Sequence, residues 1–370
     1  MRTSSAAILI APLLSSLAIA SATRAGAPAA PRSMPRYQHI FLIIEENKDY
    51  DELIGAASIA PNLNRLAHTY GSATSFYAEV HPSEGNYVAI LGGDTFGIHD
   101  DDAYYCTPHR QDTWCEKSNG PDYVDHTVRE RGLADQLEAH GLTWKAYLES
   151  IPEPGSGAVR WPTAEHPVAG VAPEIYAVKH NGFMSFKQVQ DDPRRAAKLV
   201  GFDVLDADLA AGRMPNYAHI VPNQCNDMHG RDAGPGVPED CRKSNHAGLI
   251  RRGDRVLGEL VEKIMHASLW SGPSSVAIVI TFDESGKSER AGVQGCCGYD
   301  PKSAANFGGG RIPTLVITNH GPRGIEDATP YNHYSLLRTT ERAFGIEEYL
   351  RHAADRDAGV VEMTPLFEVR

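Results

Sequence analysis

Two runs of strand-type apolar residues in this chain end directly on acidic residues. Residues 40–44 lead into Glu45, Glu46 and Asn47, and residues 276–282 lead into Asp283 and Glu284. Uninterrupted runs of this kind predict strands buried on both faces, and ligands of open α/β sheets bind at the carboxyl ends of such strands. Acids after a strand also serve as helix caps or solvated turns. Because two clusters of hard oxygen donors share this position, we expect a site for a divalent cation.

Strand-like and helical patterns alternate along most of the chain after residue 36. Further strands are predicted near 73–80, 143–148, 217–221 and 314–318, and helices from Pro61 and near 86–91, 132–140, 248–267 and 335–344. This alternation predicts crossover connections and a mostly parallel sheet. Between about 150 and 215 the apolar pattern weakens while Pro and Gly are frequent, which predicts an irregular insertion over the sheet edge.

The N-terminal residues have the pattern of a secretory signal peptide. Arg2 gives a positive start, residues 6–20 are apolar, and Ala20-Ser21-Ala22 is a small-residue cleavage pattern. The apolar stretch is short for a membrane span. We expect a signal peptide at 1–22 with cleavage as late as 27, a linker at 23–36 and a single domain at 37–370. The protein is therefore expected to be secreted or periplasmic.

The net charge of the chain disfavours one class of partner, nucleic acid. The formal net charge is -12, which argues against nucleic acid because a protein that binds the phosphate backbone needs a basic face. No later apolar stretch is long enough for a bilayer, so stable membrane insertion is not expected. We expect a partner that is small or presented at a surface, and the oligomeric state stays open.

The six cysteines form an even set, Cys106, Cys115, Cys225, Cys241, Cys296 and Cys297. In an exported chain such a set predicts disulfides. The local pairs 106 with 115 and 225 with 241 would stabilise the fold by about 2 to 4 kcal/mol each, and other connectivities remain possible. The pairing of the adjacent Cys296 and Cys297 is left open, because a vicinal disulfide is strained and their spacing fits no zinc or redox motif.

Five segments place polar, titratable residues at a strand end or in a loop. They are Glu45-Glu46-Asn47, His81 to Tyr87, Asn223 with Asp227 and His229, Asp283-Glu284, and Asn332-His333. Ser83 follows a predicted strand and precedes a helix, so its hydroxyl is expected near a helix N-terminus that favours an anion. Such a serine is often only an N-cap. As a nucleophile it needs a base or a metal, and the chain offers oxygen ligands rather than a Gly-x-Ser-x-Gly elbow.

Other polar residues have simpler interpretations. Asp100, Asp101 and Asp102 lack the spaced donors of an EF-hand loop, so a solvated loop is predicted there. Glu84 is expected to be a helix-start acid, which the helix dipole favours. His219 is expected to be a structural histidine.

Eight segments resemble, in order, the blocks of a known family. They are HIFLIIEENKDYDELIG, APNLNRLA, HPSEGNYVAILGG, KHNGFMSF, VPNQCNDMH, VAIVITFDE, GRIPTLVI and YNHYSLLRTTE. Over nearly all of residues 38–345 the chain is similar to the bacterial phosphoesterase family of secreted acid phosphatases and phospholipases C, in the alkaline-phosphatase-like superfamily. The resemblance implies an α/β fold, a three-layer α/β/α sandwich with a mostly parallel central sheet.

The resemblance also implies a metal site and a nucleophile. Glu46 and Asn47 match the family's metal-binding pair, and Asp283 with Glu284 matches the acidic pair that closes the site. Ser83 takes the place of the nucleophile, whose oxygen is itself a metal ligand. The metal is a divalent ion, and Ca²⁺, Mg²⁺, Mn²⁺, Zn²⁺ and Fe all remain open.

Further residues are expected around the phosphate. Asn86 matches the asparagine that holds a phosphate oxygen. The resemblance makes six further residues phosphate contacts, leaving-group acids or further metal ligands: His81, Lys179, His180, Asp227, His229 and His333. Of these we assign His81, Lys179, His180 and Asp227 to substrate binding, and His229 and His333 to proton transfer during catalysis. Gly85 and Gly182 stand where the family more often has proline, so both loops are expected to be looser here.

Together these features predict an exported, metal-dependent acid phosphatase that hydrolyses phosphate monoesters through a phosphoserine at Ser83. A histidine acting in its protonated form would favour an acidic pH optimum. One alternative is a phospholipase C or phosphoinositide phosphatase that acts on phosphoesters of a lipid headgroup. Another is a secreted protein that binds phosphate or a metal without turnover.

Overall fold

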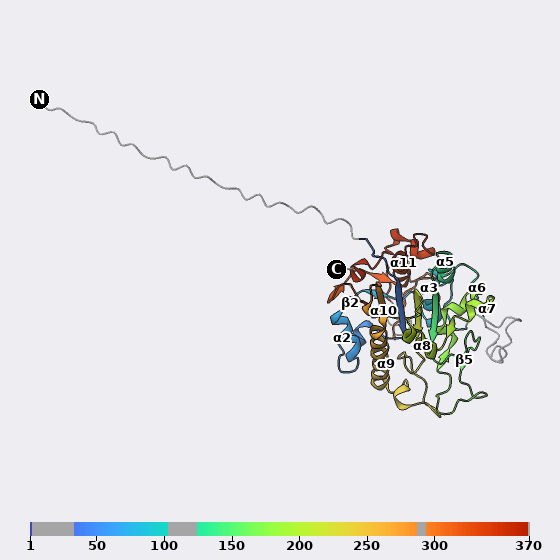
Figure 1. Cartoon of the computed structure of the whole chain (residues 1–370). Coiled ribbons are helices and arrows are strands. Elements are labelled where there is room, and N and C mark those ends of the chain that lie inside the picture. The colour runs from blue at the N-terminus through green and yellow to red at the C-terminus, as the bar shows by residue number, and fades with distance from the viewer. Residues whose placement is uncertain (2–32, 103–123, 287–293, 369–370) are drawn as a thin grey trace. The chain divides into compact units, whose positions relative to one another are not determined.

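The computed structural model describes residue 1 and residues 33–102, 124–286 and 294–368 (Figure 1). The predicted signal peptide at 1–22 and the predicted pair Cys106 and Cys115 lie outside this part of the chain, apart from Met1. In the described part, no helix combines the length and apolar character that crossing a membrane requires.

An eight-stranded sheet forms the centre of the fold, in the order β11-β2-β10-β9-β1-β8-β4-β7. Its strands are β1 (His39–Glu45), β2 (Gly71–Ala73), β4 (Trp144–Leu148), β7 (Leu199–Val200), β8 (Tyr217–Val221), β9 (Val276–Phe282), β10 (Thr314–Thr318) and β11 (Ile325–Asp327). β10 runs antiparallel to both of its neighbours, and the other pairs of this sheet are parallel. The predicted mostly parallel sheet is confirmed.

The two acid-tipped strands are neighbours at the centre of the sheet. β1 lies between β8 and β9, and all residues of β9 are buried, as are those of β1 from Ile40 onward. A strand that is paired on both edges and covered on both faces has no solvated side. This position explains why both runs are apolar without alternation.

Helices cover both faces of the sheet. α2 (Pro61–Thr69) packs against α9 (His246–His266), and α3 (Ser83–Gly92) packs against α11 (His333–Phe344). The crossovers through α2 and α9 move along the sheet in one direction, and the connection from β2 through α3 and α5 (Leu133–Ala139) to β4 moves in the other. Right-handed crossovers therefore place these two groups on opposite faces, and the predicted three-layer α/β/α fold is confirmed.

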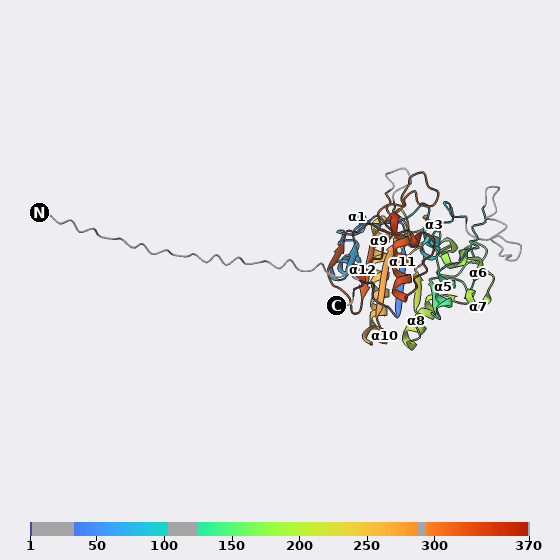
Figure 2. The same cartoon turned by 90° about the horizontal axis from the view of Figure 1, so that it is seen from above.

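Figures 1 and 2 show which helices lie toward each end of the sheet. In Figures 1 and 2, α6 (Lys187–Gln190) and α7 (Pro193–Ala196) lie at the end of the sheet that carries β7. α1 (Tyr50–Leu53) and α2 lie at the opposite end, beside β2.

The sequence predictions of element positions fail in two places. The predicted strand 73–80 is divided, because β2 ends at Ala73 and β3 (Phe76–Tyr77) pairs with β12 (Tyr331–Asn332) outside the main sheet. The region 150–215, predicted to be irregular, contains α8 (Phe202–Ala211) and the edge strand β7. A strand of two residues is too short for its pattern to be recognised.

The part of the chain that the structure describes contains one disulfide that was predicted and one that was not. Cys225 and Cys241 are joined across a sequence separation of 16, as predicted. Cys296 and Cys297 are also joined, although the sequence left them without a pairing.

Candidate active site

Glu46 and Asp283 come together because β1 and β9 are parallel neighbours in register. The Asp283 N–H donates to the Glu45 carbonyl at 3.0 Å. Asn47 follows at φ 32°, in the left-handed region, and its N–H donates to Asp283 Oδ1 at 3.0 Å. Its side-chain amide donates to Glu284 Oε1 at 2.6 Å. The two acid-tipped strands thus form one cluster at the carboxyl edge of the sheet.

Ser83 is brought to this cluster by α3. It is the first residue of the helix, it is 1% exposed, and its hydroxyl donates to Glu46 Oε2 at 3.2 Å. Pro82 occupies the N-cap position, so Ser83 is not the cap of this helix. One turn later, the Tyr87 hydroxyl donates to Glu46 Oε1 at 2.7 Å. Both carboxylate oxygens of Glu46 are therefore engaged by side chains of α3.

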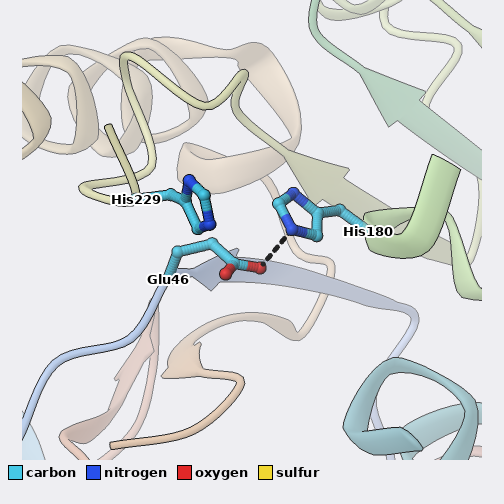
Figure 3. Close-up of side chains that lie close together, drawn as sticks. All are labelled: Glu46, His180 and His229. Atoms are coloured by element: carbon cyan, nitrogen blue, oxygen red, sulfur yellow. Dashed lines mark ion pairs between the residues drawn. The ribbon is translucent and has the colours of Figure 1, made fainter. Parts of the chain in front are cut away.

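Two histidines also lie close to Glu46 (Figure 3). His180, at the end of η1 (Val178–His180), places Nε2 3.1 Å from Glu46 Oε1 and Nδ1 3.7 Å from Asp227 Oδ2. The rings of His180 and His229 lie 5.6 Å apart. Glu46, His180 and His229 each offer a ligand atom within 4.8 Å of the other two. The geometry thus keeps both histidines among the groups that could hold a metal.

The acidic cluster is buried, and burial sets its electrostatics. Burial raises the pKa of Glu46 well above its usual range, and repulsion from Asp283 and Asp227 adds to this rise. Burial likewise raises the pKa of Asp227 and of Asp283, and it raises the pKa of Glu284 to about 7. Four carboxyl groups buried this close together can all be ionised only if a positive charge nearby offsets their mutual repulsion.

Several buried oxygens of the cluster are available to a cation. Asn47 Oδ1, Asp227 Oδ2 and Asp283 Oδ2 accept no hydrogen bond from the residues that the structure describes. A buried polar atom without a partner costs about 1 to 3 kcal/mol. Carboxylate and amide oxygens suit Ca²⁺, Mg²⁺ or Mn²⁺, and the two histidines extend the choice to Zn²⁺ or Fe. The residues present therefore fit a divalent metal ion.

His81 and Lys179 lie beside the cluster, and each pairs with an acid; their contact with substrate stays a prediction. His81 Nδ1 lies 2.5 Å from Glu284 Oε2. Lys179 Nζ donates to Asp101 Oδ2 at 2.7 Å. Asp101 is exposed and lies in a loop, as predicted, and it also holds this lysine at the site.

Asn86 serves the loop that precedes α3. Its Oδ1 accepts from the N–H groups of Glu79 and Val80 at 3.0 and 3.3 Å, and its amide donates to the Val80 carbonyl at 2.9 Å. These bonds fix the chain that leads into Ser83. A direct contact between Asn86 and phosphate stays a prediction.

The two histidines assigned to proton transfer differ in position. His229 lies at the cluster, and burial followed by the charge of Lys179 lowers its pKa well below the usual range. His333 is fully buried, with Nε2 3.1 Å from the Phe282 carbonyl and its ring 5.6 Å from that of Phe76, and burial lowers its pKa to about 4. Neither pKa favours a protonated histidine, so the expected acidic optimum has no support from these residues. Their catalytic roles stay predictions.

Sequence reasoning missed several residues of the site. Tyr87 binds Glu46 and stacks on His180, with ring centroids 5.3 Å apart. Its position four residues after Ser83 was a usable signal, because such residues share a helix face. Buried Lys48 donates to the carbonyls of Asn47 and Met228 at 3.0 and 2.9 Å, a link that no local pattern indicates.

Glu84 is more than a helix-start acid. Its Oε2 lies 2.9 Å from His126 Nδ1, and His126 Nε2 lies 3.2 Å from Asp100 Oδ1. Glu84 is 1% exposed. Burial lowers the pKa of His126, but Glu84 and Asp100 raise it by more, so the pKa of His126 lies above its usual value. The histidine joins the start of α3 to the segment around residue 100.

The glycines at the two loops are tightly packed, which corrects the expectation that these loops are loose. A Cβ at Gly85 would lie 2.6 Å from the Ile98 carbonyl oxygen, and a Cβ at Gly182 would lie 2.6 Å from the Tyr87 carbonyl oxygen. Real Cβ atoms do not approach so closely, so both positions require glycine in this arrangement.

Similar proteins support the chemistry that this site suggests. A probable acid phosphatase of Kluyveromyces lactis is 28% identical over 355 residues, which is 96% of this chain and 69% of that protein. A phosphatidylinositol-3-phosphatase of Mycobacterium tuberculosis is 25% identical over 86% of this chain and 80% of its own length. Among solved structures, the PsFucS1 sulfatase from Pseudoalteromonas sp. has a TM-score of 0.50 and 12% identity, over 90% of this chain and 74% of that one, and shows the fold alone.

A family model also matches this chain. It covers residues 56–347, which include Ser83, His180, His229 and Asp283. At the level of the family, the prediction of a hydrolase that acts on phosphoric esters is confirmed. The chain belongs to the Phosphoesterase family.

Proposed function

We propose that the protein is an exported, metal-dependent acid phosphatase that hydrolyses phosphate monoesters through a phosphoserine at Ser83. The observation that carries this proposal is the 3.2 Å contact between the Ser83 hydroxyl and Glu46 Oε2. It places a candidate nucleophile at the helix end next to a buried acidic cluster that fits a cation. Similarity to an acid phosphatase supports the substrate class.

Glu46, Asn47, Asp283 and Glu284 would hold the metal together with Ser83. When bound, a divalent cation would neutralise the buried carboxylates, polarise the phosphoryl group and favour loss of the serine proton. The orphan oxygens of Asn47 and Asp283 are the observation behind this ligand set. His180 is a further candidate ligand.

In the first step Ser83 Oγ bonds to phosphorus as the bond to the leaving oxygen breaks. Glu46 Oε2 accepts the hydrogen bond of the serine hydroxyl and orients it. The serine proton passes to water, and the leaving oxygen takes up a proton from water. The N-terminus of α3 favours the phosphoryl charge, and Lys179 adds a fixed positive charge. Burial lowers the pKa of Lys179, but the nearby acids Asp101 and Glu46 raise it by more. The net pKa is therefore raised, and Lys179 stays protonated.

In the second step water attacks the phosphoserine, and His229 is suited to act as the base. Its Nδ1 lies 2.8 Å from the Gly230 carbonyl, which can only accept, so Nδ1 carries the proton and Nε2 has a free lone pair. The lowered pKa keeps the ring neutral. A neutral imidazole at this position removes a proton from water more readily than it donates one.

The test is release of p-nitrophenol from p-nitrophenyl phosphate between about pH 5 and 8, with each divalent metal added in turn. Ser83→Ala is expected to lower kcat by at least about a thousandfold, while Ser271→Ala, on the exposed helix α10 (Ser268–Ser271), is the matched control. No release with any metal would refute the phosphatase, and full turnover by Ser83→Ala would refute the phosphoserine.

A second candidate is hydrolysis of lipid headgroup phosphoesters. Similarity to a phosphatidylinositol-3-phosphatase favours it. Phosphatidylinositol 3-phosphate in phosphatidylcholine vesicles and p-nitrophenyl phosphorylcholine separate the phosphoinositide phosphatase from the phospholipase C. Turnover of either one well above that of p-nitrophenyl phosphate would replace the first proposal.

A further inference from the structure

A cavity of about 360 Å³ opens beside the candidate active site. Lys179 and His229 line it, and both belong to the site already described. The rest of its wall comes from residues that the proposed chemistry does not use. The most distinctive of these are three cations, Arg160, Arg231 and Lys243.

The three cations are open to an incoming ligand. The side chains of Arg160, Arg231 and Lys243 are 56%, 22% and 47% exposed. Together with Lys179, they face this one cavity.

These cations belong to elements that also carry residues of the candidate active site. Arg160 lies on β5 (Arg160–Trp161), which pairs with β6 (Tyr176–Ala177), and β6 leads directly into the turn with Lys179. Arg231 follows His229 in the segment closed by the disulfide between Cys225 and Cys241.

Backbone hydrogen bonds order the rest of this wall. The Arg231 N–H donates to the Cys241 carbonyl at 2.8 Å, and the Lys243 N–H donates to the Arg231 carbonyl at 2.9 Å. The backbone that carries Arg231 and Lys243 is therefore ordered next to the segment with His229, which favours a specificity site.

Acids of the cavity compensate these cations only in part. Glu174 Oε2 is shared between Arg160 at 3.4 Å and Arg231 at 2.7 Å. Lys243 Nζ lies 4.0 Å from Asp232, whose side chain is 91% exposed. The cavity wall thus holds four cations against three carboxylates, with Asp101 as the third. A guest with a phosphate group would complete the pairing of the two guanidinium groups.

We propose that this cavity is a subsite for a second anionic group, which makes the preferred substrate a sugar or polyol phosphate that carries another phosphate. The proposal rests on the proposed function, because the scissile ester is the one that reaches Ser83. Lys179 would contact both phosphates, whereas Arg160, Arg231 and Lys243 would contact the second one alone. The second phosphate can belong to a soluble molecule or to a lipid headgroup.

The test compares kcat/KM for fructose 1,6-bisphosphate with kcat/KM for fructose 6-phosphate. The double variant Arg160→Gln/Lys243→Gln is expected to lower this ratio by about tenfold, and more at low than at high salt. Arg255→Gln removes an exposed cation that pairs with Glu259 on α9, and it is expected to leave the ratio unchanged. A vesicle arm with phosphatidylinositol 3-phosphate shows whether the lipid source gives the same loss.

Binding is measured separately from turnover. In a Ser83→Ala background, calorimetry is expected to show tighter binding of fructose 1,6-bisphosphate than of fructose 6-phosphate, and the double variant is expected to remove the difference. An unchanged kcat/KM ratio for the two sugars together with an unchanged kcat/KM on the vesicles would overturn the subsite. Equal affinities for the two sugars would overturn it as well. If no substrate is hydrolysed but the affinities differ as expected, the proposed function fails while the subsite stands.

Discussion

The Tyr87 hydroxyl donates a 2.7 Å hydrogen bond to Glu46, a carboxylate that is fully buried at the end of β1. The tyrosine is also fully buried and lies one helical turn after Ser83. Glu46 is therefore held by a residue of the same helix that carries the candidate nucleophile. The pair fixes the distance between the carboxylate cluster and the reacting hydroxyl.

Tyr87→Phe tests this positioning. Loss of a hydrogen bond to a charged, buried group is expected to lower kcat for p-nitrophenyl phosphate by about tenfold, with a smaller change in KM. Tyr37→Phe is the control, because it removes a buried hydroxyl that donates to the Phe367 carbonyl at 2.6 Å. An unchanged kcat in Tyr87→Phe would show that Glu46 needs no such support.

Metal binding is expected to stabilise the fold. A ligand that binds only the folded protein, at a free concentration of about 100 times its Kd, adds about 2.7 kcal/mol to the free energy of unfolding. The melting temperature should fall on treatment with EDTA and recover when the metal is restored. Asp283→Asn should lose this recovery, because it removes one charge from the ligand set.

The control for the metal experiment is Glu259→Gln, on the exposed face of α9. It should keep the metal-dependent rise in melting temperature. Equal metal-dependent rises in Asp283→Asn and the native protein would contradict the assignment of Asp283.

Gly182→Ala tests the packing between η2 (Gly182–Ser185) and α3. The new Cβ would lie 2.6 Å from the Tyr87 carbonyl oxygen, so we expect a loss of about 1 to 3 kcal/mol in the free energy of unfolding. Gly234→Ala is the matched control, since no heavy atom lies within 4 Å of a Cβ there. Denaturant unfolding of both variants measures the difference, and equal stability would show that the loop adapts.

Glu341 is expected to make stability depend on pH. Burial raises its pKa from 4.5 to about 8, while its Oε1 accepts the Leu350 N–H at 2.9 Å. The folded protein therefore keeps a proton that the unfolded chain releases between these pH values. This contribution to stability is complete below about pH 4.5 and is lost as the pH rises through about 8.

Glu341→Gln removes this dependence. The variant should gain stability relative to the native protein as the pH rises from about 5 to 8, by at most about 5 kcal/mol. Denaturant unfolding across this range is the measurement. A difference between the two proteins that is constant with pH would mean that Glu341 is ionised in the fold.

The local sequence pattern was sufficient to predict the central strands and the longer helices. The runs that became β1 and β9 are apolar throughout because both faces are covered, and α9 has the helical spacing of a single buried face. Short elements such as β7 carry too few residues for any period. Their place depends on the sheet edge that other strands provide.

By itself, the sequence determined the acid-tipped strands, the position of Ser83 before a helix and the order of the family's blocks. Tertiary structure alone decided which groups meet at Glu46. Tyr87 and His180 reach it from separate elements, Lys179 is held by Asp101, and His333 lies against the Phe282 carbonyl rather than among these groups. The physical reason is that strand and helix periods are local, whereas the crossovers and strand order decide which distant side chains share one edge of the sheet.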